Sequence, residues 1–159
     1  MAILENFSLW AALTSIFFAQ FVKVPIQLIL LKKVDWSLIV STGGMPSSHS
    51  AAVTAVSTGI ALEVGMDSPL FAVSAVFAII TMFDASGVRR QAGEQAAVLN
   101  QLAADFNLLL KDMKAWHHME EKEKHKELKE LLGHKPIEVF FGGLTGILLT
   151  LVLYYIFNG

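Results

Sequence analysis

The residues best suited to chemistry lie in two short stretches, each at the start of an apolar segment. The first is Gly44–Ser50, Gly-Met-Pro-Ser-Ser-His-Ser, which places two hydroxyls and an imidazole side by side. The second contains His134, followed by Pro136 and Glu138. Two imidazoles at one membrane edge can carry out phosphoryl transfer without a metal, because one can attack phosphorus while the other protonates the leaving oxygen.

The first stretch has the features of a phosphate site at a helix N-terminus. Free N–H groups and a partial positive charge at such an end bind phosphate. Ser47 and Ser48 can add hydroxyl donors, and His49 would then stand beside the bound group as a general acid. The same residues also suit a plain helix start, because serine is a common N-cap. Both interpretations remain open on this stretch alone.

The second stretch pairs a histidine with a carboxylate. Glu138 follows His134 at a spacing that puts both on one helical face, where the acid can hold the attacking imidazole tautomer. A charge at the head of a spanning helix is a functional candidate by default. His117, His118 and His125 could ligate a metal, but incidental histidines on a surface helix are the favoured interpretation, so no metal is expected.

The composition predicts a membrane protein. Of 159 residues, 54% are hydrophobic and only 16% are charged, and the mean hydropathy is +0.55. Soluble domains carry about 25% charged residues. One domain over residues 1–159 is expected at this length. Cysteine is absent, which excludes disulfide and thiolate chemistry. The membrane is the expected environment, no nucleic-acid partner or cofactor is expected, and a homo-oligomer is left open.

The apolar segments predict an all-α integral membrane bundle of about four spanning helices, with a fifth left open. They are Asn6–Val22, continuing to Leu31 past Pro25, then His49–Leu62, Ser68–Phe83 and Val139–Phe157. Pro25 can kink or break the first segment. Small residues recur every four positions at Ala51, Ala55 and Gly59, and at Gly142 and Gly146, a spacing that permits close helix contact in lipid.

The basic residues predict the topology. All Lys and Arg residues except Lys23 lie in the first and third connections or at their boundaries, so both connections face the cytoplasm and both termini face outward. Residues 91–133 form a cytoplasmic helical insertion. Within it, an apolar face over Leu99–Met113 predicts a helix that lies on the bilayer surface or packs over the site. The site then faces the cytoplasm.

At these motifs the chain resembles the type 2 phosphatidic acid phosphatase superfamily, specifically its small divergent bacterial and plant branch. That pattern has a lysine with Arg-Pro six residues later, then Pro-Ser-Gly-His, then Ser-Arg, five residues, His, three residues and Asp. Pro46–His49 match the middle motif, with Ser48 in place of glycine. His134 and Glu138 match the end of the last motif, with glutamate for aspartate.

The remaining positions depart from the pattern. Lys23 is the candidate for the first lysine, but no Arg-Pro follows it, and Leu128 stands where an arginine would precede His134. The nearest arginines are Arg89 and Arg90. We infer that the insertion splits the last motif and that one of these two arginines supplies the phosphate clamp.

The resemblance implies a metal-independent membrane phosphatase in a bacterial cell membrane. His134 would form a phosphohistidine, Glu138 would orient it, and His49 would protonate the departing alcohol. Lys23, Arg89 or Arg90, and the N–H groups of Ser47 and Ser48 would bind the phosphoryl oxygens. The expected substrate is a phospholipid phosphate, phosphatidylglycerophosphate first and phosphatidic acid second. The alternatives are a non-catalytic protein that binds an anionic headgroup or a partner, and, more weakly, a small transporter subunit.

Overall fold

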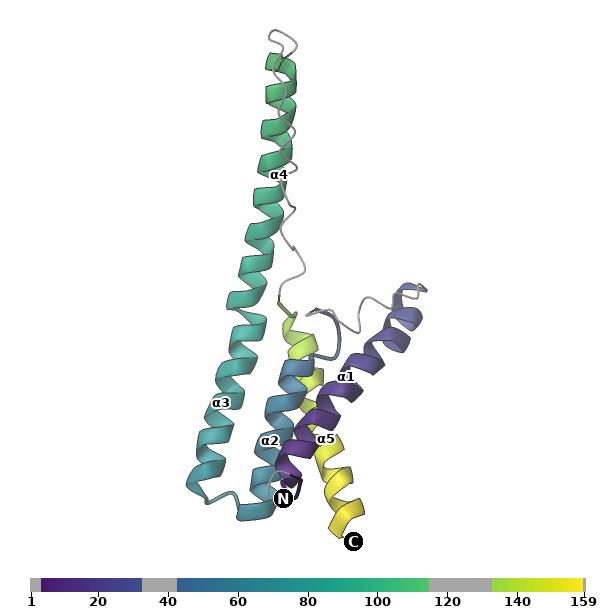
Figure 1. Cartoon of the computed structure of the whole chain (residues 1–159), viewed down its shortest axis with the longest axis vertical. Helices are drawn as coiled ribbons and strands as arrows, with labels where there is room; N and C mark the ends of the chain where they lie inside the picture. Colours follow the sequence, from purple (N-terminus) through teal and green to yellow (C-terminus); the bar gives the residue numbers. More distant parts are fainter. Residues whose placement is uncertain (1–3, 33–42, 115–132, 159) are drawn as a thin grey trace.

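The chain folds into helices only, over the part that the structure describes. The computed structural model describes residues 4–32, 43–114 and 133–158, which contain five helices and no strand. This confirms the all-α prediction. In chain order the helices are α1 (Phe7–Leu31), α2 (Ser48–Val64), α3 (Pro69–Ser86), α4 (Val88–Lys114) and α5 (Pro136–Asn158) (Figure 1).

Local sequence signals set the helix starts. The side chain of Asn6 accepts from the N–H of Leu9 at 2.8 Å, and that of Ser68 accepts from the N–H of Phe71 at 3.2 Å. Such side-chain acceptors satisfy first-turn N–H groups that have no partner within the helix. α1 continues through Pro25 without interruption to Leu31, so this proline does not divide the first apolar segment into two helices.

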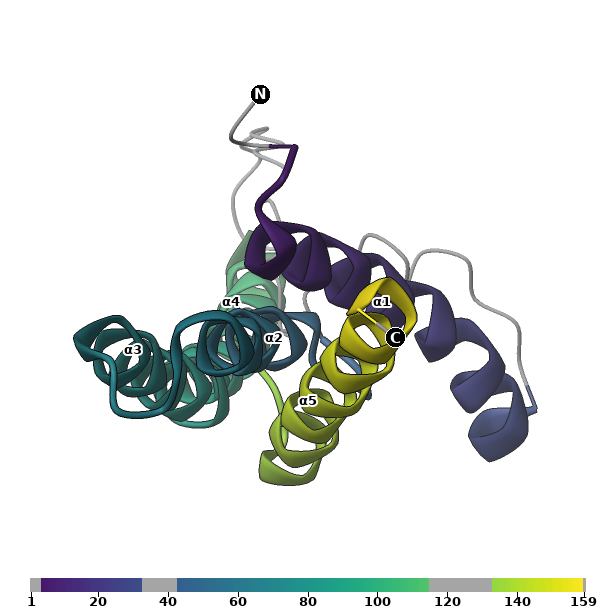
Figure 2. The same ribbon diagram turned by 90° about the horizontal axis from the view of Figure 1, so that it is seen from below.

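α2 is the central helix, and it packs against α1, α3 and α5 (Figure 2). Ala51 and Ala55 on this helix are 0% exposed. Gly59 lies against Ser8 of α1, and Gly146 of α5 lies against the Ala51 carbonyl, so close that a Cβ on either glycine would collide. Thr54 adds an interhelical hydrogen bond from its Oγ1 to the carbonyl of Gly143, at 2.9 Å. The predicted small-residue spacing thus serves close helix packing.

α3 and α4 follow one another with only Gly87 between them. The Gly87 N–H donates to the carbonyl of Phe83 at 2.9 Å, and the Gln91 N–H donates to the Gly87 carbonyl at 3.0 Å. In Figure 1, α4 continues roughly in the direction of α3, away from the other helices. Among the described residues α4 packs only against α3. Of the two alternatives for the amphipathic helix, packing over the site is therefore wrong, because α4 runs away from the bundle beyond Gly87. A position on the bilayer surface stays a prediction.

Three stretches have the length and composition to cross a membrane: Phe7–Ile29, Pro69–Leu110 and Pro136–Phe157. α2, with 17 residues, is shorter and spans about 26 Å at 1.5 Å per residue, which is close to the hydrocarbon thickness. α3 alone is about 27 Å long on the same basis, so α4 extends beyond that thickness. The bundle of about four helices agrees with the prediction.

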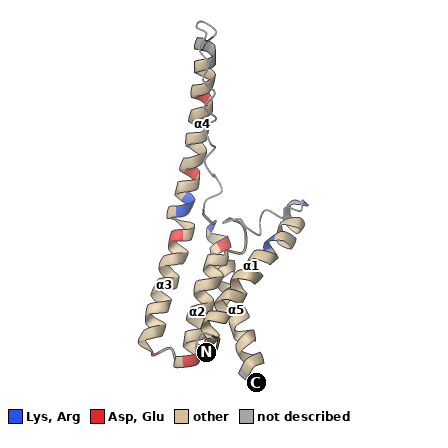
Figure 3. Cartoon of the chain, viewed as in Figure 1, with Lys and Arg blue, Asp and Glu red and all other residues tan. Residues whose placement is uncertain are grey.

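Charged residues gather at one end of this bundle and beyond it (Figure 3). The basic residues of that end are Lys23, Lys32, Arg89, Arg90 and Lys135. The opposite end, where the chain termini lie in Figure 1, carries Glu63, whose carboxylate accepts from the Ser8 hydroxyl at 2.5 Å. The two histidine motifs lie at the basic end.

Candidate active site

His134 is held in place by the loop that leads into α5. Its N–H donates to the carbonyl of Ala85 at the end of α3, at 2.9 Å. The residue before it, Gly133, has φ +89°, a conformation that glycine adopts without strain. One turn into the helix, Glu138 Oε2 lies 3.2 Å from Nδ1 of His134 and also accepts from the Lys135 N–H at 3.0 Å. The acid therefore holds one ring nitrogen of His134.

The other ring nitrogen of His134 is buried and unused. The residue is 2% exposed, and its Nε2 has no hydrogen-bond partner among the described residues. Leaving a buried polar atom unpaired costs about 1–3 kcal/mol. Since Glu138 fixes Nδ1, the lone pair of a neutral imidazole would lie on Nε2. This is the arrangement that a histidine nucleophile requires.

His49 lies beside His134. The two ring centroids are 6.1 Å apart with an interplanar angle of 61°. His49 is the second residue of α2 and is exposed, whereas His134 is buried. A backbone hydrogen bond of 3.0 Å from the Ser47 N–H to the Glu138 carbonyl joins the two motifs directly. The structure thus brings together the two predicted histidines and Glu138.

Ser47 and Ser48 have a structural part in this arrangement. The Ser47 hydroxyl is the N-cap of α2 and accepts from the Ser50 N–H at 3.3 Å. Its own N–H, which was expected to face phosphate, donates to Glu138 instead. Gly142 lies against the Ser47 backbone, and both serines are buried. The helix-cap interpretation of Ser47 is therefore confirmed, while a phosphate contact of Ser48 stays a prediction.

Lys23 lies inside the bundle at the same end. It comes from α1, is 1% exposed, and lies within electrostatic range of Glu138. A Cβ on Gly44, which has φ +91°, would touch its side chain at 3.7 Å. Three segments that are far apart in the sequence therefore contribute charged or polar groups to one site.

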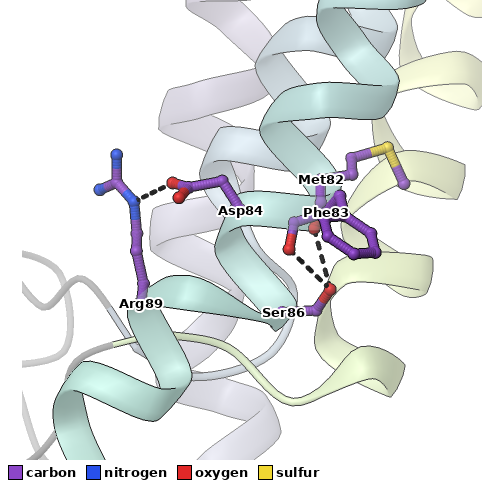
Figure 4. A network of polar contacts seen from close by, with 5 residues as sticks. All are labelled: Met82, Phe83, Asp84, Ser86 and Arg89. Atoms are coloured by element: carbon purple, nitrogen blue, oxygen red, sulfur yellow. Dashed lines mark hydrogen bonds and ion pairs between the residues drawn. The ribbon is translucent and has the colours of Figure 1, made fainter.

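The two candidate arginines differ in their surroundings. Arg89 Nε pairs with Asp84 Oδ2 at 2.6 Å across the α3–α4 junction (Figure 4), and both residues lie within electrostatic range of His49. Arg90 Nε pairs with Glu94 Oε1 at 3.0 Å, one turn along α4. Both arginine side chains are exposed. Of the two, Arg89 is the one that lies within electrostatic range of His49.

The two halves of the split motif meet in space. A Cβ on Gly133 would collide with the backbone of Arg89 and Arg90. The chain thus returns from the insertion to the point where it left, and His134 bonds to Ala85 there. This is the arrangement expected if residues 91–133 interrupt one motif.

Sequence reasoning missed Asp84 as a site residue. It is the first charge after the apolar run of α3 and stands five positions before Arg89, which was the available signal. Its carboxylate pairs with the exposed Arg89 side chain (Figure 4), and both residues lie within electrostatic range of His49. At the same junction, the Ser86 hydroxyl donates to the carbonyls of Met82 at 3.0 Å and Phe83 at 3.3 Å.

No group of three His, Asp or Glu side chains that could hold a metal occurs within residues 4–32, 43–114 and 133–158. His117, His118 and His125, the open alternative for a metal, lie outside the described residues.

The fold and the site define a class: an all-α membrane bundle with paired histidines at its basic end. The chain belongs to the divergent PAP2 family, whose profile matches residues 4–149. It is also similar to a Bacillus subtilis (strain 168) protein described as uncharacterized membrane protein YuiD, with 68% identity over 157 residues and 99% of each chain covered. No solved structure matches the chain.

Proposed function

We propose that this protein is a metal-independent phosphatase that hydrolyses a lipid phosphomonoester through a phosphohistidine intermediate. The observation that carries the proposal is the state of His134: Nδ1 is held by Glu138 at 3.2 Å, and Nε2 is buried without a partner among the described residues, beside His49. Membership of the divergent PAP2 family supports a phosphatase-related role.

The reaction has two steps. The lone pair of His134 Nε2 forms a bond to phosphorus while the bond from phosphorus to the lipid oxygen breaks, and protonated His49 gives its proton to that oxygen. Water then attacks the phosphohistidine, and neutral His49 takes a proton from it. Phosphate leaves, and His134 returns to its starting state. Glu138 stabilises the positive charge on the His134 ring during both steps.

Negative charge on the phosphoryl oxygens in the transition state is stabilised best by cationic groups that are already held in position. Lys23 and Arg89 each lie within electrostatic range of His49. Lys23 is fixed by burial, and Arg89 is oriented by Asp84. Because His49 is exposed and His134 is not, substrate reaches Nε2 when the His49 side chain rotates aside.

The substrate follows from the position of the site. A basic bundle end faces the cytoplasm by the positive-inside rule. A lipid in that leaflet would keep its acyl chains in hydrocarbon while its phosphate meets His49 and Lys23. We propose phosphatidylglycerophosphate, converted to phosphatidylglycerol, as the first substrate and phosphatidic acid as the second.

The burial of His134 favours a second candidate function. At 2% exposure the nucleophile is covered, and no Arg-Pro follows Lys23 as in the phosphatase pattern. A protein that binds an anionic headgroup through Lys23 and Arg89 without cleaving it would keep the same pocket.

The deciding experiment measures phosphate release by the purified protein from a panel of lipid phosphates in chelator-treated buffer. The expected result is release from at least one lipid, inhibition by vanadate, and a 32P-labelled, acid-labile protein adduct that His134→Ala does not form. Saturable lipid-phosphate binding with no phosphate release would exclude catalysis and support the binding protein.

A further inference from the structure

A groove in the apolar part of the bundle runs from near the site towards the opposite end. It has a volume of about 470 Å3 and runs between α2, α3 and α5. Its walls include Thr54, Ala61, Phe71, Ala75, Met82 and Ile147. α3 and α5 make few direct contacts because α2 lies between them (Figure 2).

Although the wall of the groove contains hydroxyl groups, the surface that it presents is mainly carbon. Thr54 Oγ1 bonds to the carbonyls of Ser50 at 2.8 Å and Gly143 at 2.9 Å, and Ser57 Oγ donates to Val53 at 3.0 Å. Side chains whose polar atoms are already bonded to backbone present their carbon atoms to a ligand. The groove therefore suits a hydrocarbon chain.

One end of the groove lies about one helical turn from the site. Thr54 lies one helical turn, about 5 Å, below Ser50, which directly follows His49. On the opposite wall, Met82 lies within one turn of Ala85, whose carbonyl holds the N–H of His134. A molecule whose phosphate lies between the two histidines would therefore place its next atoms at the mouth of the groove.

The groove extends along most of α3. From Phe71 to Met82 it runs about 17 Å at 1.5 Å per residue, and Met66 at its far end belongs to the α2–α3 connection. A chain that starts at the site would therefore pass the bilayer midplane, about 15 Å away, and continue towards the opposite end of the bundle.

We propose that this groove binds one acyl chain of the lipid phosphate whose headgroup occupies the histidine site. The inference rests on the proposed function for the identity of the headgroup. It makes the enzyme selective for long-chain lipids, because burial of each additional methylene adds to binding. Bulk membrane lipid, held without regard to its headgroup, is the alternative occupant.

The kinetic test uses a substitution that fills part of the groove. Ala75 on α3 is half-buried and lines it, whereas Val73 on the same helix is 69% exposed and does not. Ala75→Phe should lower kcat/KM for dioleoyl phosphatidic acid about tenfold, equivalent to about 1.4 kcal/mol, and leave hydrolysis of para-nitrophenyl phosphate unchanged. Val73→Phe should leave both substrates unchanged. Equal losses on both substrates in Ala75→Phe would overturn the proposal.

A binding measurement tests whether the groove holds the acyl chain, independently of catalysis. In the His134→Ala background, single Ala75→Cys and Val73→Cys variants carry a bimane label, since the chain has no cysteine of its own. Chain-brominated phosphatidic acid should quench the label at position 75 saturably, with competition from unbrominated phosphatidic acid, and brominated phosphatidylcholine should not. At position 73 the two lipids should quench alike. Identical quenching by both lipids at position 75 would overturn the groove assignment, whereas absence of phosphate release from the wild-type protein would overturn only the proposed function.

Discussion

At the scale of single residues, Glu138 occupies one ring nitrogen of His134 and leaves the other for the proposed chemistry. Glu138 holds Nδ1 at 3.2 Å, and the backbone of Ala85 holds the residue itself at 2.9 Å. Nε2 is left buried and unpaired among the described residues. A histidine that served only packing would be expected to bond both nitrogens, so the free atom points to a reacting partner.

His49 and His134 should respond differently to the leaving group. His49→Ala should lower turnover of a lipid phosphate by about 10²–10⁴-fold, the usual contribution of a general acid. The same variant should lose much less on para-nitrophenyl phosphate, whose leaving group needs no proton. His134→Ala should abolish turnover of both. Equal losses of His49→Ala on the two substrates, measured as kcat, would remove the basis for its role as acid.

Arg89 and Arg90 form a matched pair for the phosphate clamp. Arg89→Ala should lower kcat/KM by about 10–100-fold, because a hydrogen bond to a charged group contributes about 1.5–3 kcal/mol. Arg90→Ala should cost no more than about fivefold, since it removes only an exposed ion pair with Glu94. The measurement is phosphate release at sub-saturating lipid, and a larger loss in Arg90→Ala would reverse the assignment.

At the scale of elements, the contact of α2 with α5 positions the two histidine motifs. Gly142 lies against the Ser47 backbone, Gly146 lies against Ala51, and the Ser47 N–H bonds to the Glu138 carbonyl. These contacts bring the N-termini of the two helices together. The distance between His49 and His134 therefore depends on the close packing at Gly142 and Gly146, further along α5.

Two adjacent glycines of α5 test this dependence. Gly142→Ala would drive a Cβ into the rigid backbone of Ser47, and overpacking of this kind costs about 1–3 kcal/mol. Gly143→Ala would meet the flexible end of Met82 at 3.1 Å and the Thr54 methyl group at an ordinary 3.4 Å, so the better helix propensity of alanine should offset the contact. Thermal unfolding in detergent should show a lower Tm for Gly142→Ala alone. Equal Tm values for the two variants would show that the contact between α2 and α5 accommodates the added Cβ without loss of stability, which would contradict this dependence.

At the scale of the whole molecule, the lysines and arginines near the bundle lie at one of its ends, together with several carboxylates (Figure 3). Lys23, Arg89, Arg90 and Lys135 belong to the end with the histidines. Glu63 and Asp67 belong to the other, where the chain termini also lie. Loop charge of this kind orients membrane proteins with the basic end inside, which underlies the proposed cytoplasmic site.

Cysteine labelling in intact cells tests this orientation. Asp67 in the α2–α3 connection and Gln95 on α4 are both exposed, and the chain has no native cysteine to add background. An impermeant thiol reagent should label Asp67→Cys and should label Gln95→Cys only after the cells are opened. The reverse pattern would place the site outside the cell and require a different set of substrates.

The sequence alone determined those features that depend on neighbours within a few residues. The apolar runs predicted α1, α2, α3 and α5, because burial in lipid demands long uncharged helices. The spacing of His134 and Glu138 predicted their pairing, since residues four apart share one face of a helix. Serine before an apolar run signalled the start of α2 at Ser47.

Only the tertiary structure decided what depends on contacts between distant segments. It rejoined Gly133 to Arg89 and Arg90 across the insertion, and it distinguished the two arginines by their partners Asp84 and Glu94. It also directed α4 away from the bundle and opened the groove between α3 and α5. The physical reason is that these features follow from how helices fit together through small residues and backbone bonds, and the hydrophobic pattern of each helix does not specify that fit.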